Sequence, residues 1–210
     1  MKKIQITFAT ILLNLLLFDS PLAEEETLPK KTSVNTAKQS VEPRDQNIHI
    51  KVRNDGEQII VDANFIVPVV PKQAWAVLTD FENIPRFNSG VLSSKVTGRT
   101  GNRLQVWQKG ISKYGFMSFS YESVREINLI PFKKIQERMI SGSMKKMEEA
   151  TELSPEENQT RITYHAIFIP GMWVPPMVGN VFIKHEAREQ FQQLIDEIRR
   201  RQMNIAGHEP

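Results

Sequence analysis

The sequence contains no cysteine among its 210 residues. This absence excludes disulfide bonds, thiolate metal sites and a cysteine nucleophile. Histidine is also scarce, and His49, His165, His185 and His208 do not have the close spacing that metal ligands show. We therefore expect no metal and no cofactor, and a fold that depends on its apolar core alone.

The sequence also lacks a large charge of one sign. Its 27 Lys and Arg residues stand against 24 Asp and Glu residues, which gives a formal net charge of +3. Nucleic-acid binding needs a clustered basic patch rather than a small excess spread along the chain. We expect no nucleic acid among the partners, and a monomer.

Long apolar runs are missing except at the N-terminus. Two lysines precede an almost wholly apolar stretch, residues 4–18, which is too short to span a membrane comfortably. This pattern is typical of a signal peptide. We predict that residues 1–23 are cleaved after Ala23 and that the protein is exported, to the periplasm of a bacterium. Because Pro21 stands where the peptidase prefers a small residue, an uncleaved segment that tethers the protein to the membrane is the alternative.

Residues 24–47 contain few apolar side chains and many Glu, Lys, Thr, Ser, Asn, Gln and Pro. Such a segment cannot bury enough surface to offset the entropy lost on ordering. We interpret it as a flexible leader that acts as a spacer, with a partner-binding tail as the alternative. The remaining length suits one domain, which we place at residues 48–202, followed by a flexible tail at 203–210.

Alternating apolar residues and turn signals predict an antiparallel sheet. The run from His49 to Val67 turns at Asn54-Asp55-Gly56 and then carries an apolar residue at every second position, which indicates a hairpin with one buried face. Six further strands follow, separated by the short turns that join neighbouring antiparallel strands. They are residues 91–97, 103–109, 115–126, 132–140, 145–153 and 160–169.

Helical patterns flank these six strands. Residues 73–80 have apolar side chains at helical spacing, and Pro85 then breaks and restarts the helix. A long helix is predicted over residues 177–200, where the apolar side chains share one broad stripe. The order of elements is therefore a hairpin, two short helices, a meander of strands and one long terminal helix.

Two segments carry a family resemblance. Residues 79–91, Thr-Asp-Phe-Glu-Asn-Ile-Pro-Arg-Phe-Asn-Ser-Gly-Val, resemble the helix–helix junction of the START-like superfamily, also called SRPBCC or helix-grip. Residues 142–148, Gly-Ser-Met-Lys-Lys-Met-Glu, are similar to a Gly-x-Phe-Lys-x-Phe-Glu segment of its polyketide cyclase and coenzyme Q-binding branch. Met144 and Met147 replace the two aromatic residues of that segment. Glu149 and Thr151 stand where Gly and Trp often follow.

The resemblance implies an α+β helix-grip fold. A curved antiparallel sheet of about six or seven strands would wrap around the long C-terminal helix, with two short helices after the first strand. Such an arrangement leaves a cavity between sheet and helix, and an apolar lining suits an apolar ligand. For each candidate lining residue, plain core packing is the alternative. The candidates are Trp107, Phe119, Tyr121, Met139, Met144, Tyr164, Phe168, Trp173, Met177, Phe182 and His185.

The sequence shows no catalytic constellation. His165 lies beside Tyr164 in a predicted strand, and His185 precedes a glutamate by four residues on the terminal helix, so each is a candidate base oriented by a carboxylate. The simpler interpretation is a surface or hydrogen-bonded histidine. Glu148 and Glu149 are interpreted as solvated charges of a turn or strand edge.

The connection before the terminal helix, residues 170–177, is apolar where loops are normally polar. We expect Met172 and Trp173 either to cap the cavity mouth or to make transient contact with a membrane, because Trp suits that interface. Burial against the start of the helix is the alternative.

The expected function is to bind a hydrophobic small molecule, such as a lipid, a quinone or a polyketide-like compound, without catalysis. One alternative is a cyclase-like or hydratase-like enzyme that uses a cavity His, Tyr or Glu. It requires a titratable group with a shifted pKa inside the cavity. Another is a protein-interaction module, as in the toxin-like members of the superfamily that associate with ribosomes. It would present a large exposed apolar or basic face.

Overall fold

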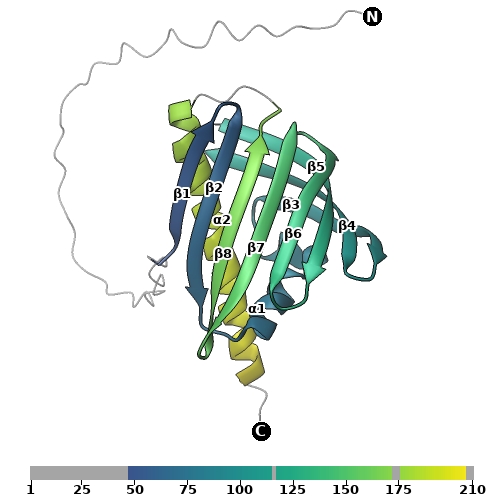
Figure 1. Ribbon diagram of the computed structural model, residues 1–210, viewed down its shortest axis with the longest axis vertical. Coiled ribbons are helices and arrows are strands. Elements are labelled where there is room, and N and C mark those ends of the chain that lie inside the picture. The colour runs from purple at the N-terminus through teal and green to yellow at the C-terminus, as the bar shows by residue number, and fades with distance from the viewer. Residues whose placement is uncertain (1–46, 115–116, 172–175, 207–210) are drawn as a thin grey trace, which may run out of the picture. The chain divides into compact units, whose positions relative to one another are not determined.

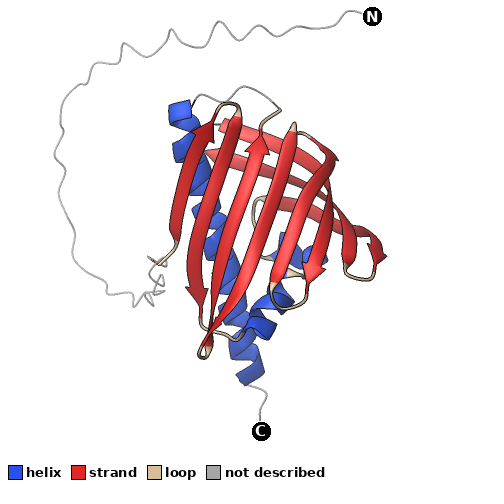
Figure 2. Cartoon of the chain, viewed as in Figure 1, coloured by secondary structure: helices blue, strands red, loops and turns tan. Residues whose placement is uncertain are grey.

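The computed structural model describes residues 47–114, 117–171 and 176–206, with side chains described except at 112–119, 176–178 and 205–206. All of these residues belong to one compact unit of the chain, Glu42–Pro210. Within them, eight strands form one antiparallel sheet, and helices pack against it (Figure 1; Figure 2). The predicted α+β helix-grip fold is confirmed, and its sheet has one strand more than the six or seven that the resemblance implied.

The sheet begins with the predicted hairpin, β1 (His49–Asp55) and β2 (Gln58–Val67). Gly56 in its turn has a φ of +58°, in the left-handed region that favours glycine. The last strand pairs with β2, which gives the order β1-β2-β8-β7-β6-β5-β4-β3. The six strands of the predicted meander are β3 (Val91–Thr100), β4 (Arg103–Tyr114), β5 (Met117–Ile130), β6 (Lys134–Gly142), β7 (Lys146–Glu156) and β8 (Gln159–Ile169).

Two short helices lie between β2 and β3. They are α1 (Pro71–Leu78) and the 3-10 helix η1 (Phe81–Arg86). Pro71 occupies the first turn of α1, where its missing amide costs no hydrogen bond. The hairpin therefore contributes two strands before the helices, where the resemblance implied one.

The long terminal helix is α2 (Pro176–Ala206), which has 31 residues and continues six residues beyond its predicted end. In Figure 1 it lies behind the part of the sheet formed by β1, β2 and β8. In the described parts of the chain, no helix is long and apolar enough to cross a membrane.

The main core lies between α2 and the strands in front of it. Every second residue of β2 from Ile59 to Val67 is buried, so one face of this strand points to the helices. Ile195 and Ile198 of α2 are fully buried in the same cluster. We call the helix-covered side of the sheet the inner face. Alternation along each strand decides which side chains reach it.

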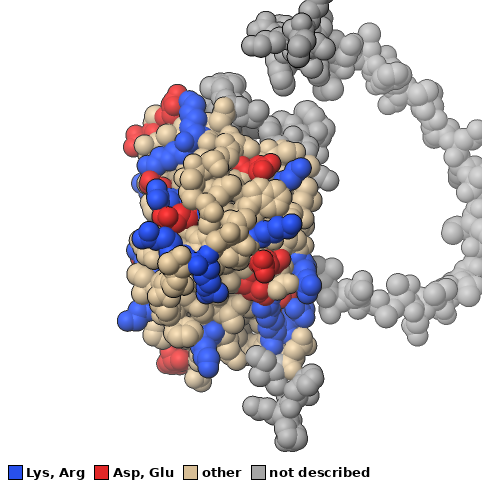
Figure 3. Space-filling model, turned by 90° about the vertical axis from the view of Figure 1, so that its right-hand side faces the viewer, with Lys and Arg blue, Asp and Glu red and all other residues tan. Residues whose placement is uncertain are grey.

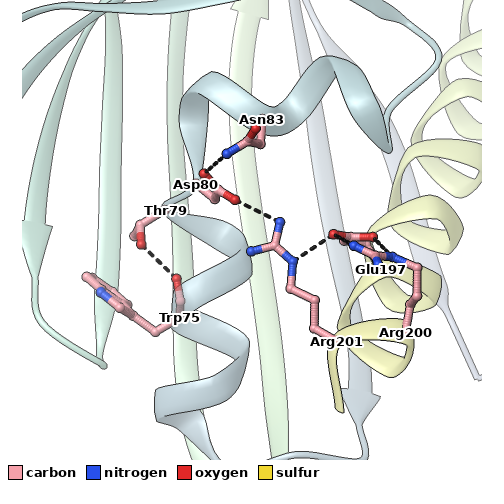
Figure 4. Close-up of polar contacts among 7 residues, drawn as sticks. All are labelled: Trp75, Thr79, Asp80, Asn83, Glu197, Arg200 and Arg201. Carbon is pink, nitrogen blue, oxygen red and sulfur yellow. Dashed lines mark hydrogen bonds and ion pairs between the residues drawn. The ribbon is translucent and has the colours of Figure 1, made fainter. Parts of the chain in front are cut away.

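The C-terminal half of α2 is fixed to the junction between α1 and η1 (Figure 4). Arg201 donates to Asp80 Oδ2 at 2.8 Å and to Glu197 Oε1 at 2.7 Å. Asn83 donates to the other oxygen of Asp80 at 2.7 Å, and Thr79 Oγ1 donates to the backbone oxygen four residues earlier. Thr79, Asp80 and Asn83 belong to the first segment of the family resemblance. Asp80 of this segment therefore holds the C-terminal half of α2 through Arg201.

Candidate ligand-binding site

A cavity of about 380 Å³ lies between the inner face of the sheet, the α1–η1 region and the first half of α2. Its volume falls in the range of small-molecule sites. The wall is mainly apolar, and each of these elements contributes to it. The apolar side chains include Val61, Leu78, Phe81, Ile84, Met147, Ile183, Ala187 and Phe191.

The structure brings together six of the residues that the sequence proposed for the lining. They come from five elements, β5, β6, β8, α2 and the loop before β7. They are Tyr121, Met139, Met144, Tyr164, Phe168 and Phe182. Met144, in the second resemblance segment, therefore lies on the cavity wall.

Two proposed residues lie elsewhere, which corrects their assignment. Trp107 follows Val106 and precedes Gln108, which are both buried on the inner face, so its own side chain points to the outer face. Its indole nitrogen donates to Glu122 Oε1 at 2.8 Å. His185 is exposed on α2 and is not part of the wall.

Other predicted residues fall outside this site or outside the description. His165 does meet a carboxylate, since its Nδ1 lies 2.7 Å from Asp62 Oδ1, but both side chains are on the outer face. The side chains of Phe119 and Met177, and the whole of Met172 and Trp173, lie outside the described residues.

Three of the charged side chains in the wall of the cavity come from adjacent strands, Arg125 on β5, Glu137 on β6 and Glu149 on β7. We call them the charged cluster. Arg125 Nη1 donates to Glu137 Oε2 at 2.7 Å, and the two side chains are only 10% and 13% exposed. Glu137 is also directly opposite Glu149 in the β6–β7 register. Two carboxylates therefore share one guanidinium inside the protein.

This arrangement raises the pKa of Glu149 to about 7, from an ordinary value of 4.5. Burial is the main cause, because it disfavours the charged form, and the negative charge of Glu137 adds to it. Arg125 and a hydrogen bond with Tyr164 oppose the rise. Glu149 is half-buried, and it faces the cavity and not the outer surface.

Two tyrosines border the charged cluster. Burial, followed by the charge of Glu149, raises the pKa of Tyr164 well above its usual value, so its hydroxyl stays protonated. Burial likewise raises the pKa of Tyr121. The ring of Tyr121 lies against Gly110, where an added Cβ would come within 2.3 Å of it. Gly110 thus makes room for an aromatic side chain in the wall.

Arg125 has an unused hydrogen-bond donor. The residue is 8% exposed, and its Nε has no hydrogen-bond partner in the described structure. A buried donor without a partner is unfavourable and needs an explanation. The register shift in the β5–β6 pair also falls beside Arg125, and such irregularities often re-aim side chains near functional sites.

The charged cluster was not predicted from the sequence. The interpretation of Glu148 and Glu149 as solvated charges is wrong for Glu149, which lines the cavity. Strand parity separates them, since Glu149 is two residues from the buried Met147 and therefore shares its face, whereas Glu148 is exposed. The same parity places Arg125 with Ile127, which is also buried. Counting alternate positions from an apolar residue would have identified both.

The charges on the outer surface have a different pattern. On the face seen in Figure 3, Lys and Arg side chains lie among acidic and uncharged residues and do not merge into one continuous patch. A scattered arrangement of this kind gives no strong field over that face.

The chain belongs to the family described as polyketide cyclase / dehydrase and lipid transport, which it matches over residues 67–195, more than half of its 210 residues. The match runs from the end of β2 into α2 and so includes every described residue of the cavity lining except Val61. A search of curated protein sequences gave no match.

Solved structures share the fold at low sequence identity. A STAR-related lipid transfer protein from Xanthomonas axonopodis has a TM-score of 0.62 at 12% identity, covering 73% of this chain and 94% of its own. A START superfamily protein from Mycobacterium smegmatis has a TM-score of 0.58 at 15% identity, covering 67% and 97%. The Zhui aromatase/cyclase from Streptomyces sp. R1128 has a TM-score of 0.56 at 12% identity, covering 69% and 95%. These likenesses concern the fold alone.

Proposed function

We propose that the protein is an exported carrier that holds one hydrophobic small molecule in this cavity without transforming it. The observation that supports this best is a space of about 380 Å³ with a mainly apolar wall. Each 100 Å² of apolar ligand surface buried there contributes about 2.5 kcal/mol, before entropy losses. Lipid transport in the family's description and a lipid transfer protein among the similar structures favour a lipid, a quinone or a polyketide-like compound.

Export rests on the N-terminal sequence. The basic start and the apolar residues 4–18 favour a signal peptide, and cleavage after Ala23 would release the carrier into the periplasm. N-terminal sequencing of the protein from the periplasm tests this. A first residue of Glu24 is expected, and an intact N-terminus on membrane-bound protein would support the tethered form instead.

Purification of the mature protein from exporting cells, followed by native mass spectrometry, tests the carrier proposal. We expect a bound species of lipid size, which solvent extraction then identifies. Ala187→Phe places a benzyl group on the cavity wall and should abolish this species, whereas Ala150→Phe on the outer face of β7 is the matched control. A protein that carries nothing, or an equal load in both variants, would contradict the proposal.

An enzyme is the second candidate, and one observation favours it. A cyclase-like or hydratase-like mechanism requires a titratable group in the cavity, and Glu149, with its pKa raised to about 7, lies beside the hydroxyl of Tyr164. Such a carboxyl can both give and take a proton near neutral pH. Glu149 is then the general acid or base.

The extracted ligand distinguishes the two functions. It is incubated with the parent protein and with Glu149→Gln, and its mass and chromatographic retention are followed. A carrier leaves the ligand unchanged in both samples. A change of mass or retention with the parent protein alone would establish catalysis that depends on Glu149.

A further inference from the structure

The charges on the cavity wall are unevenly distributed. Arg125 is the one basic side chain among the described residues that line it. The titratable side chains that face the cavity are Tyr121, Arg125, Glu137, Glu149, Tyr164 and Glu186, whereas the Glu122 carboxylate bonds to Trp107 on the outer face. Because Arg125 is already paired with Glu137 at 2.7 Å, no positive charge of the described wall is left to neutralise an anion.

The wall nevertheless has a free donor and a proton-bearing acid. Arg125 Nε carries an N–H group with no partner in the described structure, and the hydrogen-bonded pair of Tyr164 and protonated Glu149 keeps one further O–H group that is not used within the pair. An oxygen atom of a ligand can accept from these groups. An ammonium group cannot, because it has no acceptor.

We propose that the cavity selects an apolar molecule with an uncharged oxygen head, a carbonyl or hydroxyl group, and discriminates against the same molecule with a carboxylate or phosphate head. This inference rests on the proposed function, that the cavity binds a hydrophobic small molecule. The carboxylates of Glu137 and Glu149 would repel an anionic head of the ligand, because the protein interior screens charge poorly. A neutral oxygen meets Arg125 Nε without that repulsion.

Glu149 gives the discrimination a pH dependence with a defined sign. At acidic pH the carboxyl carries its proton and repels an anionic head less. Above neutral pH it is ionised and repels the head more. Binding of an anionic molecule should therefore weaken as the pH rises, while binding of its neutral counterpart should change little.

The test uses four probes with the same ten-carbon chain, 2-decanone, 1-decanol, decanoate and decyl phosphate, with decylammonium as a fifth. Each competes with Nile red, a neutral fluorophore, for the mature protein at pH 5.5 and pH 8. The ketone or alcohol should displace the dye at a concentration at least about tenfold lower than either anion at pH 8, since an unmatched buried charge changes affinity by this order. Decanoate should gain more affinity at pH 5.5 than the protonation of its own carboxyl group accounts for.

Glu149→Gln should remove the part of this gain that exceeds the protonation of the probe, because residue 149 then has no charge at either pH. Glu148→Gln is the matched control, since Glu148 lies on the same strand with its side chain on the outer face beside Lys146. It should behave as the parent protein does. If Glu149→Gln does not fold, the ranking of the probes and the pH dependence in the parent protein still decide the question.

The possible failures are distinct. If Nile red does not enter the protein and no probe binds, the proposed function fails and the inference falls with it. If the probes bind but decanoate or decylammonium equals the neutral pair at pH 8, the cavity function stands and the head-group inference is overturned. Equal pH dependence in the parent and in Glu149→Gln would also overturn it.

Discussion

Replacement of Glu149 by glutamine is expected to stabilise the protein at alkaline pH and to leave its stability almost unchanged in acid. Burial and the negative charge of Glu137 raise the pKa of Glu149 from 4.5 to about 7 in the folded protein. In the unfolded chain the carboxyl titrates near its ordinary value, so the folded protein still holds a proton that the unfolded chain has released. Glutamine has the shape of the protonated acid without its ionisation.

The difference between the two pKa values sets the sign and size of the effect. Below pH 4.5 Glu149 is protonated in both the folded and the unfolded protein, so its ionisation takes nothing from the free energy of unfolding. Stability falls as the pH rises from 4.5 to about 7, and above that the loss is complete. Each factor of ten in the acid constant corresponds to about 1.4 kcal/mol, so the parent protein should lose about 3 kcal/mol by pH 8.

Urea unfolding of the mature protein at pH 4.5, 6 and 8 measures this loss. The free energy of unfolding of Glu149→Gln minus that of the parent should grow from near zero to about 3 kcal/mol. Asp62 and Glu197 have lowered pKa values, so the stabilisation that each gives the folded protein is lost as the pH falls. This loss is the same in both proteins and cancels in the difference between their free energies of unfolding. Glu148→Gln should show a constant difference. A constant difference for Glu149→Gln, or a parent that is the more stable protein at pH 8, would refute the reasoning.

Three further predictions concern other residues. Arg125→Met should cost about 3 to 5 kcal/mol, because it leaves Glu137 unpaired in the interior, and adding Glu137→Met should recover most of it in urea unfolding. No recovery would mean that the pair is not coupled. Gly110→Ala should cost about 1 to 3 kcal/mol, since its Cβ would lie 2.2 Å from a backbone oxygen, whereas Gly98→Ala, with 3.6 Å to its nearest atom, should cost less than about 0.5 kcal/mol in thermal unfolding. Equal costs would contradict this. Trp emission should shift to the blue with anionic liposomes, and less so in Trp173→Ala. An equal shift in both would exclude membrane contact through this residue.

The fold was largely predictable because its signals are local. Alternation of apolar residues along residues 59–67 marks the inner face of β2, and short turns mark each step of the meander. The strand and helix ends were less predictable. The terminal helix extends to Ala206, and in this part of it Arg201 bonds to Asp80, a contact between residues 121 positions apart. No pattern within the helix contains that information.

The apolar part of the site was partly predictable, and its polar part was not. Tyr164 and Phe168 are two strand positions from the buried residues Ile162 and Ala166, so the alternation that finds the core also finds the wall. Its spacing from Met147 can place Glu149 on the inner face, but it cannot show which charges surround the carboxyl. Its environment depends on the pairing of β6 with β7, which places Glu137 opposite it. The shifted pKa is a property of that register and could not be read from composition or spacing.

The pairing of β6 with β7 also raises the question of why residue 149 is a carboxylic acid. With its pKa raised to about 7, Glu149 is expected to cost the folded protein about 3 kcal/mol above neutral pH that a glutamine would not. On this expectation the residue does not stabilise the protein there. Buried groups that lower stability are commonly found where a protein binds or reacts. Arg125 Nε, which is buried without a partner in the described structure, is unfavourable in the same way. A ligand whose polar atom pairs with this charged cluster would explain both features.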